Sequence, residues 1–115
     1  MTDFSSLPVD KLLREEGFAC GCGRKHKAYP LRYLAIAPDC LDRVIDALEQ
    51  LNVKKPFVIM GEHGRAAAGL RVMDALSRAG IGFSFFCFPE GMHILPNEEA
   101  VAMIDAAFDG SCDFV

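Results

Sequence analysis

The apolar residues of this chain repeat with two different periods, and the two periods alternate along the sequence from residue 33 onward. Short apolar runs, typical of buried strands, are each followed by a segment with apolar residues at steps of three and four, typical of an amphipathic helix. Strands that alternate with helices across short connections predict a parallel sheet built from right-handed crossovers. The alternation therefore favours the α/β class over all-helical and all-β folds.

Four strands and three helices are expected from this pattern. The strands are residues 33–37, 57–60, 83–88 and 112–115, and the helices are residues 39–52, 66–80 and 97–110. Asp39 and Asn97 are good N-cap residues, and Gly80 is a good C-cap. The predicted fold is a Rossmann-like three-layer half-domain with a parallel sheet. Because the fourth strand begins at residue 112 and simply stops, we expect a fragment that is truncated after this strand.

The first 30 residues lack this alternation, so the predicted organisation is an N-terminal segment, 1–30, followed by an incomplete nucleotide-binding domain, 31–115. The N-terminal segment carries a Cys-x-Cys-Gly element in which Cys20, Cys22 and His26 lie within seven residues. These residue types bind soft metals, but structural zinc normally has four ligands and only three are evident. No metal site is predicted here, and the glycines of the element indicate a turn-rich segment.

The composition excludes several classes of function. With 115 residues, 51% of them hydrophobic and 24% charged, the chain can form one small folded domain. The 12 Lys and Arg residues are outnumbered by 16 Asp and Glu, and the net charge of −4 argues against a nucleic-acid-binding face. The longest apolar run, residues 81–88, is far shorter than the roughly 20 residues of a membrane helix. Five cysteines, an odd number, favour a reducing compartment, so a cytoplasmic location is expected.

The loop after the second expected strand is the candidate ligand site, because ligands of parallel sheets bind at the carboxyl ends of the strands. Gly61, Glu62 and His63 lie there. Gly61 leaves space for a ligand, and Glu62 can accept hydrogen bonds from sugar hydroxyls. The alternative is a solvated loop with a carboxylate that caps the next helix. The sequence contains neither a Gly-x-Gly-x-x-Gly phosphate loop nor a self-contained catalytic arrangement, so no catalytic residue is predicted.

Residues 18–26, Phe-Ala-Cys-Gly-Cys-Gly-Arg-Lys-His, point to a family. They resemble the Cys-x-Cys-Gly-Lys-x-His opening of sn-glycerol-1-phosphate dehydrogenases and their bacterial relatives. These proteins belong to the iron-containing alcohol dehydrogenase and dehydroquinate synthase-like superfamily. The similarity covers most of the chain, from Phe18 to Val115. It includes residues 33–36, 57–60, 66–69 and 95–99.

The resemblance implies the N-terminal NAD- or NADP-binding domain of a metal-dependent polyol-phosphate dehydrogenase, an oxidoreductase. In this family a glycine-rich pyrophosphate loop follows the strand that begins here at residue 112, and a helical domain binds a divalent metal through one Asp and two His. This chain lacks both, so the isolated chain is expected to be inactive. Relatives commonly carry Asp where this chain has Gly61, which implies weaker discrimination between NAD and NADP.

A second interpretation is a non-catalytic interaction module that keeps the half-fold and binds a nucleotide or a metal. The expected partner is a nucleotide cofactor and, for a dehydrogenase, a C-terminal helical domain that is missing or separately encoded. No nucleic-acid or membrane partner is expected. The sequence leaves open a homo-oligomer, the substrate, the choice between NAD and NADP, and the role of Cys20, Cys22 and His26.

Overall fold

The computed structural model describes residues 17–19, 21–27 and 31–115. The chain divides into two compact units, Met1–Leu34 and Ala35–Val115, and each is described by itself. The predicted boundary after residue 30, between an N-terminal segment and a nucleotide-binding domain, stays a prediction.

The described part of the first unit is a small antiparallel hairpin. Strand β1, Phe18–Ala19, pairs with strand β2, Lys25–His26. Gly17 and Gly23 have left-handed backbones, with φ of 69° and 80°. A Cβ atom at Gly17 would clash with the carbonyl oxygen of His26, so only glycine fits at this position. The prediction of a turn-rich segment is confirmed for residues 21–27, and Cys20 lies outside the described residues.

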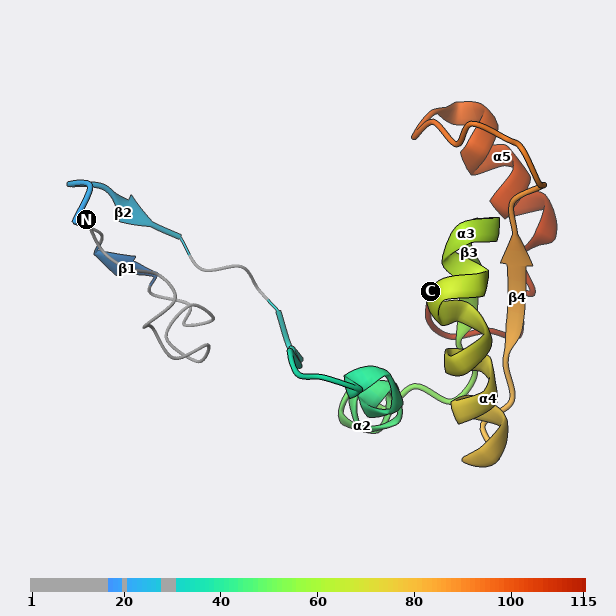
Figure 1. Ribbon diagram of the computed structural model, residues 1–115, viewed down its shortest axis with the longest axis horizontal. Coiled ribbons are helices and arrows are strands. Elements are labelled where there is room, and N and C mark those ends of the chain that lie inside the picture. The colour runs from blue at the N-terminus through green and yellow to red at the C-terminus, as the bar shows by residue number, and fades with distance from the viewer. Residues whose placement is uncertain (1–16, 20, 28–30) are drawn as a thin grey trace. The chain divides into compact units, whose positions relative to one another are not determined.

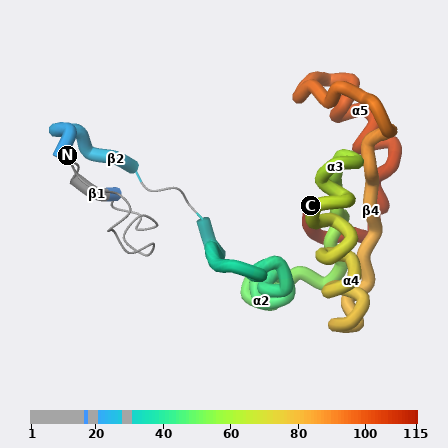
Figure 2. Tube along the Cα trace, viewed as in Figure 1, coloured from blue at the N-terminus to red at the C-terminus, as the bar shows by residue number. Residues whose placement is uncertain are grey.

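The second unit is built around a β-α-β arrangement (Figure 1). Strand β3, Phe57–Met60, leads into a helical stretch that returns the chain to strand β4, Ser84–Cys87. Figure 2 shows the chain running along this helix and back along β4 in the opposite direction. The two strands are parallel, with Phe57 opposite Ser84 and Met60 opposite Cys87. The helical stretch consists of α3 (Glu62–Gly64), the π-helical segment η3 (Arg65–Gly69) and α4 (Leu70–Arg78).

Three further helical elements flank this arrangement. The 3-10 helix η2, Cys40–Arg43, and helix α2, Val44–Gln50, precede β3 and pack against α4. Helix α5, Glu98–Ala107, follows β4. On the side of β3 opposite β4, Phe114 forms a parallel bridge with Pro56, and the Phe57 N–H donates to the Phe114 carbonyl at 2.8 Å. The order across the sheet is therefore β4, β3 and then residue 114.

Both faces of β3 are covered. Successive side chains of a strand point to opposite faces, and here each face has a buried side chain that packs against another part of the unit. The Phe57 ring, 2% exposed, packs edge-on against the Phe108 ring beyond α5, with 5.2 Å between the ring centroids. Met60 points the other way, against the helix, where a Cβ atom on Gly69 would lie 2.7 Å from the Met60 sulfur. The expectation that residues 57–60 form a strand buried on both faces is confirmed.

The predicted helix ends are confirmed at two positions and wrong at a third. The side chain of Asn97 accepts a hydrogen bond from the Ala100 N–H at 3.0 Å, as an N-cap should, and Gly80 ends α4 with φ of 70°. Asp39 does not cap a helix: its φ is 53° and its side chain makes no capping bond. The chain enters α2 through a 3-10 turn, and the Asp39 carboxylate instead faces Arg71 at 3.7 Å.

The parallel pairing of the runs at residues 57 and 83 is confirmed, but the predicted four-stranded sheet is wrong. Residues 33–37 form no strand, and Leu34 and Ile36 are 40% and 79% exposed. Their apolar pattern suits a strand, but a strand also needs a neighbour for its backbone groups, and none pairs with them in the part of the chain that the structure describes. The run at 112–115 contributes a single bridge, at Phe114.

Candidate functional site

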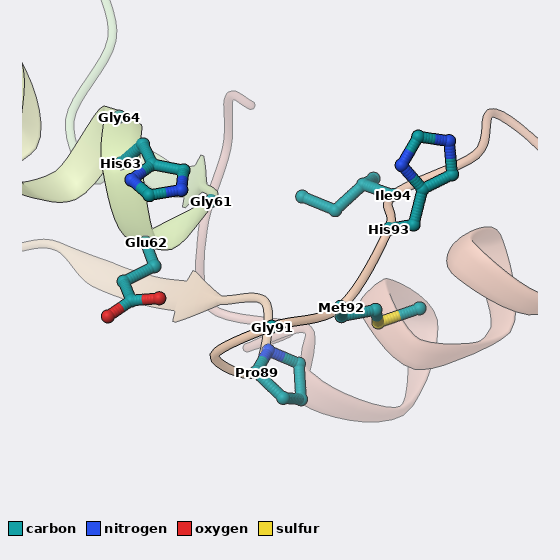
Figure 3. Close-up of a pocket in the computed structure, with 9 residues that line it drawn as sticks. All are labelled: Gly61, Glu62, His63, Gly64, Pro89, Gly91, Met92, His93 and Ile94. Atoms are coloured by element: carbon teal, nitrogen blue, oxygen red, sulfur yellow. The ribbon is translucent and has the colours of Figure 1, made fainter.

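A cavity of about 480 Å³ lies at the carboxyl ends of β3 and β4 (Figure 3). Residues 61–64 line it from the end of β3, and Pro89 and residues 91–94 line it from the segment after β4. We call these two segments the carboxyl-end rim. The volume falls in the range of roughly 300–1,000 Å³ that is typical of small-molecule sites.

Backbone hydrogen bonds fix both segments of the carboxyl-end rim. Gly61 is extended, with φ of −91° and ψ of 169°, and its carbonyl accepts the Arg65 N–H at 2.8 Å, which turns the strand directly into the helix. On the other side, the Met92 N–H donates to the Pro89 carbonyl at 3.2 Å, and Gly91 takes a φ of 72° that suits glycine. The shape of the rim is therefore set by the main chain.

The structure brings Gly61, Glu62 and His63, the residues selected from the sequence, to the wall of this cavity. Their side chains differ in direction. Figure 3 shows the Glu62 carboxylate directed away from the facing segment, whereas the Ile94 side chain reaches toward Gly61. Glu62 therefore needs a different rotamer to meet a sugar hydroxyl inside the cavity.

The space beside Gly61 is already partly filled. A Cβ atom on Gly61 would lie 3.0 Å from the Ile94 Cδ1 atom, and Ile94 is 42% exposed. The sequence assigns this space to a ligand, and a single atom at the Cβ position would meet the flexible end of one side chain and no backbone within 4 Å.

Polar side chains of the carboxyl-end rim have no protein partners in the part of the chain that the structure describes. This holds for Glu62, His63 and His93, none of which forms a hydrogen bond or ion pair there. A carboxylate accepts hydrogen bonds, and a neutral imidazole both donates and accepts. The carboxyl-end rim therefore carries groups that suit hydroxyls and amides, and Glu62 reaches the cavity only in another rotamer. His93 lies at the same edge of the sheet because it follows β4, and Figure 3 shows its ring directed away from Gly61.

No group of three or more His, Cys, Asp or Glu side chains within the described ranges is arranged to bind a metal. The Cys22 sulfur lies 3.3 Å from the His26 Nε2 atom, and Cys20 lies outside the described residues. The divalent metal that the family resemblance implies therefore has no matching ligand set in this part of the chain, and we assign no step to it.

A second polar group, which we call the amino-end cluster, lies where β3 and β4 begin and consists of Lys55, Ser84, Asp109, Ser111 and Asp113. The Asp109 carboxylate accepts hydrogen bonds from the Lys55 Nζ, the Ser84 Oγ and the Ser111 Oγ, each at 2.6 Å, and from the Ser111 N–H at 2.9 Å. These bonds, above all the one from Lys55, hold the pKa of Asp109 well below its usual value, and the bond to Asp109 raises the pKa of Lys55. Asp109 is thus the centre of the amino-end cluster.

Asp113 extends the amino-end cluster toward residue 114. Its carboxylate accepts the backbone N–H groups of Lys55 at 2.9 Å and Lys54 at 2.8 Å, which lower its pKa, and its own N–H donates to the Lys55 carbonyl at 3.0 Å. These bonds set the register of the last segment beside β3. Sequence reasoning missed the cluster, although Asp-Gly-Ser at 109–111 is a turn pattern in which an aspartate bonds to nearby backbone.

Comparison with family models, with curated proteins and with solved structures finds no significant match to this chain. The family resemblance of residues 18–26 therefore stays a prediction. None of the helices in the described part of the chain is long and apolar enough to cross a membrane.

Proposed function

We propose that this chain is the cofactor-binding part of an NAD(P)-dependent dehydrogenase that acts on a polyol phosphate such as glycerol 1-phosphate. The observation that carries the proposal is the cavity at the carboxyl ends of two parallel strands, lined by Gly61, Glu62 and His63. The dehydrogenase class and the substrate rest on the resemblance of residues 18–26. The nucleotide rests on the position of the cavity.

The order of the strands supports a doubly wound α/β fold, the class that includes the Rossmann and the flavodoxin-like folds. Counted along the chain from β3, the second strand and the Phe114 bridge lie on opposite sides of the first. This second-first-third order occurs in doubly wound nucleotide-binding folds, in which ligands sit beyond the carboxyl ends of the strands.

The residues of the carboxyl-end rim fit the adenosine end of a dinucleotide. Gly61 allows a ligand to approach the backbone closely once the Ile94 side chain moves. Glu62 and His63 supply an acceptor and a donor for ribose hydroxyls, and neither is engaged by other described residues. No aspartate stands at the end of β3, and Glu62 is the one acidic residue among those that line the cavity, so we expect a weaker preference for NAD over NADP than a well-placed aspartate would give.

The cofactor itself would supply the chemistry, the transfer of a hydride to or from the substrate carbon. The residues of this chain would bind and orient its adenosine end. They act at a distance from the reacting carbon, so their contribution is to affinity and to the choice between NAD and NADP.

A titration followed by two-dimensional NMR tests this function on the 115-residue chain. Addition of NADH is expected to shift the amide signals of residues 61–64 and 91–94, while signals of the amino-end cluster stay in place. Shifts that are absent, or that gather away from the carboxyl-end rim, would contradict the proposal.

The Gly61→Asp substitution tests the choice of cofactor. A carboxylate there is expected to weaken NADP binding relative to NAD by about 1–3 kcal/mol, because it clashes with the 2′-phosphate. Its Cβ atom has only the flexible end of Ile94 to displace, so the fold should persist. Gly82→Asp is the matched control, because a Cβ atom at Gly82 meets no atom within 4 Å and the residue lies before β4, at the opposite end of that strand. If Gly61→Asp leaves the ratio of NAD affinity to NADP affinity unchanged, Gly61 does not lie at the ribose of the cofactor.

A further inference from the structure

The outer edge of β4 has no strand beside it among the described residues, since β4 pairs with β3 alone. Alternate residues of a parallel strand direct their backbone groups toward the same neighbour. The Ser84 N–H donates to the Pro56 carbonyl at 3.2 Å, and the Phe88 N–H donates to the Met60 carbonyl at 2.9 Å. The even-numbered residues of this strand therefore direct their backbone groups toward β3, and the odd-numbered residues direct theirs outward. The backbone groups of Phe85 and Cys87 therefore point away from the sheet.

This edge lacks the features that usually prevent pairing with another chain. Natural edge strands carry charges, prolines or bulges that block association. Residues 79–88 contain no charged residue and no proline, and five of these ten positions are Phe or Ile. The Phe85 side chain is 50% exposed, although it belongs to a strand of the sheet.

We propose that β4 pairs with β4 of a second copy of this chain, antiparallel across a two-fold axis at Phe85. The outward N–H and C=O groups of Phe85 then bond to the same groups of Phe85 in the other copy. Phe83 of each copy lies opposite Cys87 of the other, in the same hydrogen-bonding phase.

The second copy is the occupant that these observations favour. A partner at this edge must be extended, uncharged and able to present backbone groups in a matching phase, and β4 itself meets all three conditions. Symmetric pairing also places the two exposed Phe85 rings on the same face of the joined sheet, where aromatic pairs stabilise adjacent strands. Because only a short strand is shared, the interface falls in the weak class and depends on concentration.

Sedimentation of the 115-residue chain tests the proposal, from dilute solution up to about 1 mM, where weak interfaces associate. The mass of the wild type is expected to rise reversibly from one copy to two. A chain that stays monomeric at every concentration, or whose mass grows beyond two copies, would overturn the proposal.

Phe85→Lys locates the interface, because it sets two like charges opposite each other at the axis. It is expected to weaken dimerisation at least about tenfold, a loss typical of a disfavoured central contact. Val101→Lys is the matched control, since Val101 is 63% exposed and lies on α5. Dimerisation of Phe85→Lys equal to that of the control would show that the interface lies elsewhere.

Two further variants keep the test decisive if Phe85→Lys does not fold. Cys87→Pro removes an outward N–H without touching the bonds between β3 and β4, and it is expected to reduce dimerisation. Phe85→Cys is expected to form a disulfide between the two copies, because Cα atoms of a hydrogen-bonded antiparallel pair lie about 5.5 Å apart. Peptide mapping shows which thiols are joined, and Val101→Cys is the reference for random linkage. The absence of a disulfide between the two introduced thiols would contradict the pairing.

Discussion

The two ends of the β3–β4 sheet use polar residues in opposite ways. At the amino end, Asp109 and Asp113 each accept several hydrogen bonds, and every member of the amino-end cluster has a partner. At the carboxyl end, Glu62, His63 and His93 have no partner in the described part of the chain. Polar groups that are satisfied within the protein hold its structure, whereas unsatisfied groups around a cavity are left for water or a ligand. The contrast separates the stabilising end of the sheet from the end that we propose binds the cofactor.

The strongest way to break the amino end is Phe57→Ala. Phe57 is 2% exposed and packs against Phe108, so its truncation is expected to cost about 3–5 kcal/mol of the free energy of unfolding. Urea denaturation measures the loss. Val101→Ala is the control, because a side chain that is mostly exposed should contribute little, and similar losses for the two variants would contradict the packing.

Asp109→Asn tests the amino-end cluster without removing volume. The amide cannot pair with the Lys55 ammonium as an anion does, so the melting temperature is expected to fall by several degrees, which calorimetry can measure. Asp105→Asn is the matched control, because Asp105 is exposed on α5 and its side chain makes no hydrogen bond to other described residues. Equal melting temperatures for the two variants would show that the cluster does not stabilise the fold.

Acid should weaken the amino end selectively. The pKa values of Asp109 and Asp113 lie below the ordinary value of 3.8, so their stabilisation is complete above that value and is lost as the pH falls through the lowered pKa. The melting temperature of the wild type is expected to drop steeply below a pH of about 4, and that of Asp109→Asn less steeply. Lys55, with its raised pKa, adds stability that is lost only at alkaline pH. If the melting temperatures of the wild type and of Asp109→Asn fall equally steeply with decreasing pH, Asp109 is not the cause of the loss of stability in acid.

Ile94→Ala tests the carboxyl-end rim and has the smallest expected effect on stability. Because Ile94 is 42% exposed, its truncation should cost about 1 kcal/mol or less. If the proposed site is correct, clearing the space beside Gly61 should strengthen NADH binding a few-fold, as measured by NMR titration. Weaker binding would mean that Ile94 contacts the cofactor and does not obstruct it.

The sequence predicts the features that depend on local pattern. The parallel β3 and β4, the cap at Asn97 and the turn at Gly80 all follow from periodicity or from one side chain near its own backbone. The expected strand at 33–37 fails because pairing depends on neighbours far along the chain. The amino-end cluster escapes prediction for the same reason, since Lys55 and Asp109 are separated by 54 residues.

Some features of the candidate site can be predicted from the sequence and others cannot. Gly61, Glu62 and His63 are predictable, because a loop that follows a buried parallel strand must lie at its carboxyl end. The same rule places the facing segment at this edge, because it follows β4, but which of its side chains reach the cavity depends on how the chain turns after β4. The direction of the Glu62 carboxylate and the filling of the space by Ile94 depend on rotamers, which periodicity does not encode.

The π-helical segment at Arg65–Gly69 has a consequence for how the length of this chain can vary. Such a segment is one residue longer than the α-helical turn it replaces. Loss of one alanine from Ala66–Ala68 would convert it to a regular helix, without turning α4 relative to the residues around Glu62. Elsewhere in an α-helix, deletion of one residue rotates everything beyond it by about 100°. Relatives of this chain that differ by a single-residue deletion are therefore expected to differ here, between the carboxyl end of the sheet and the helix that covers it.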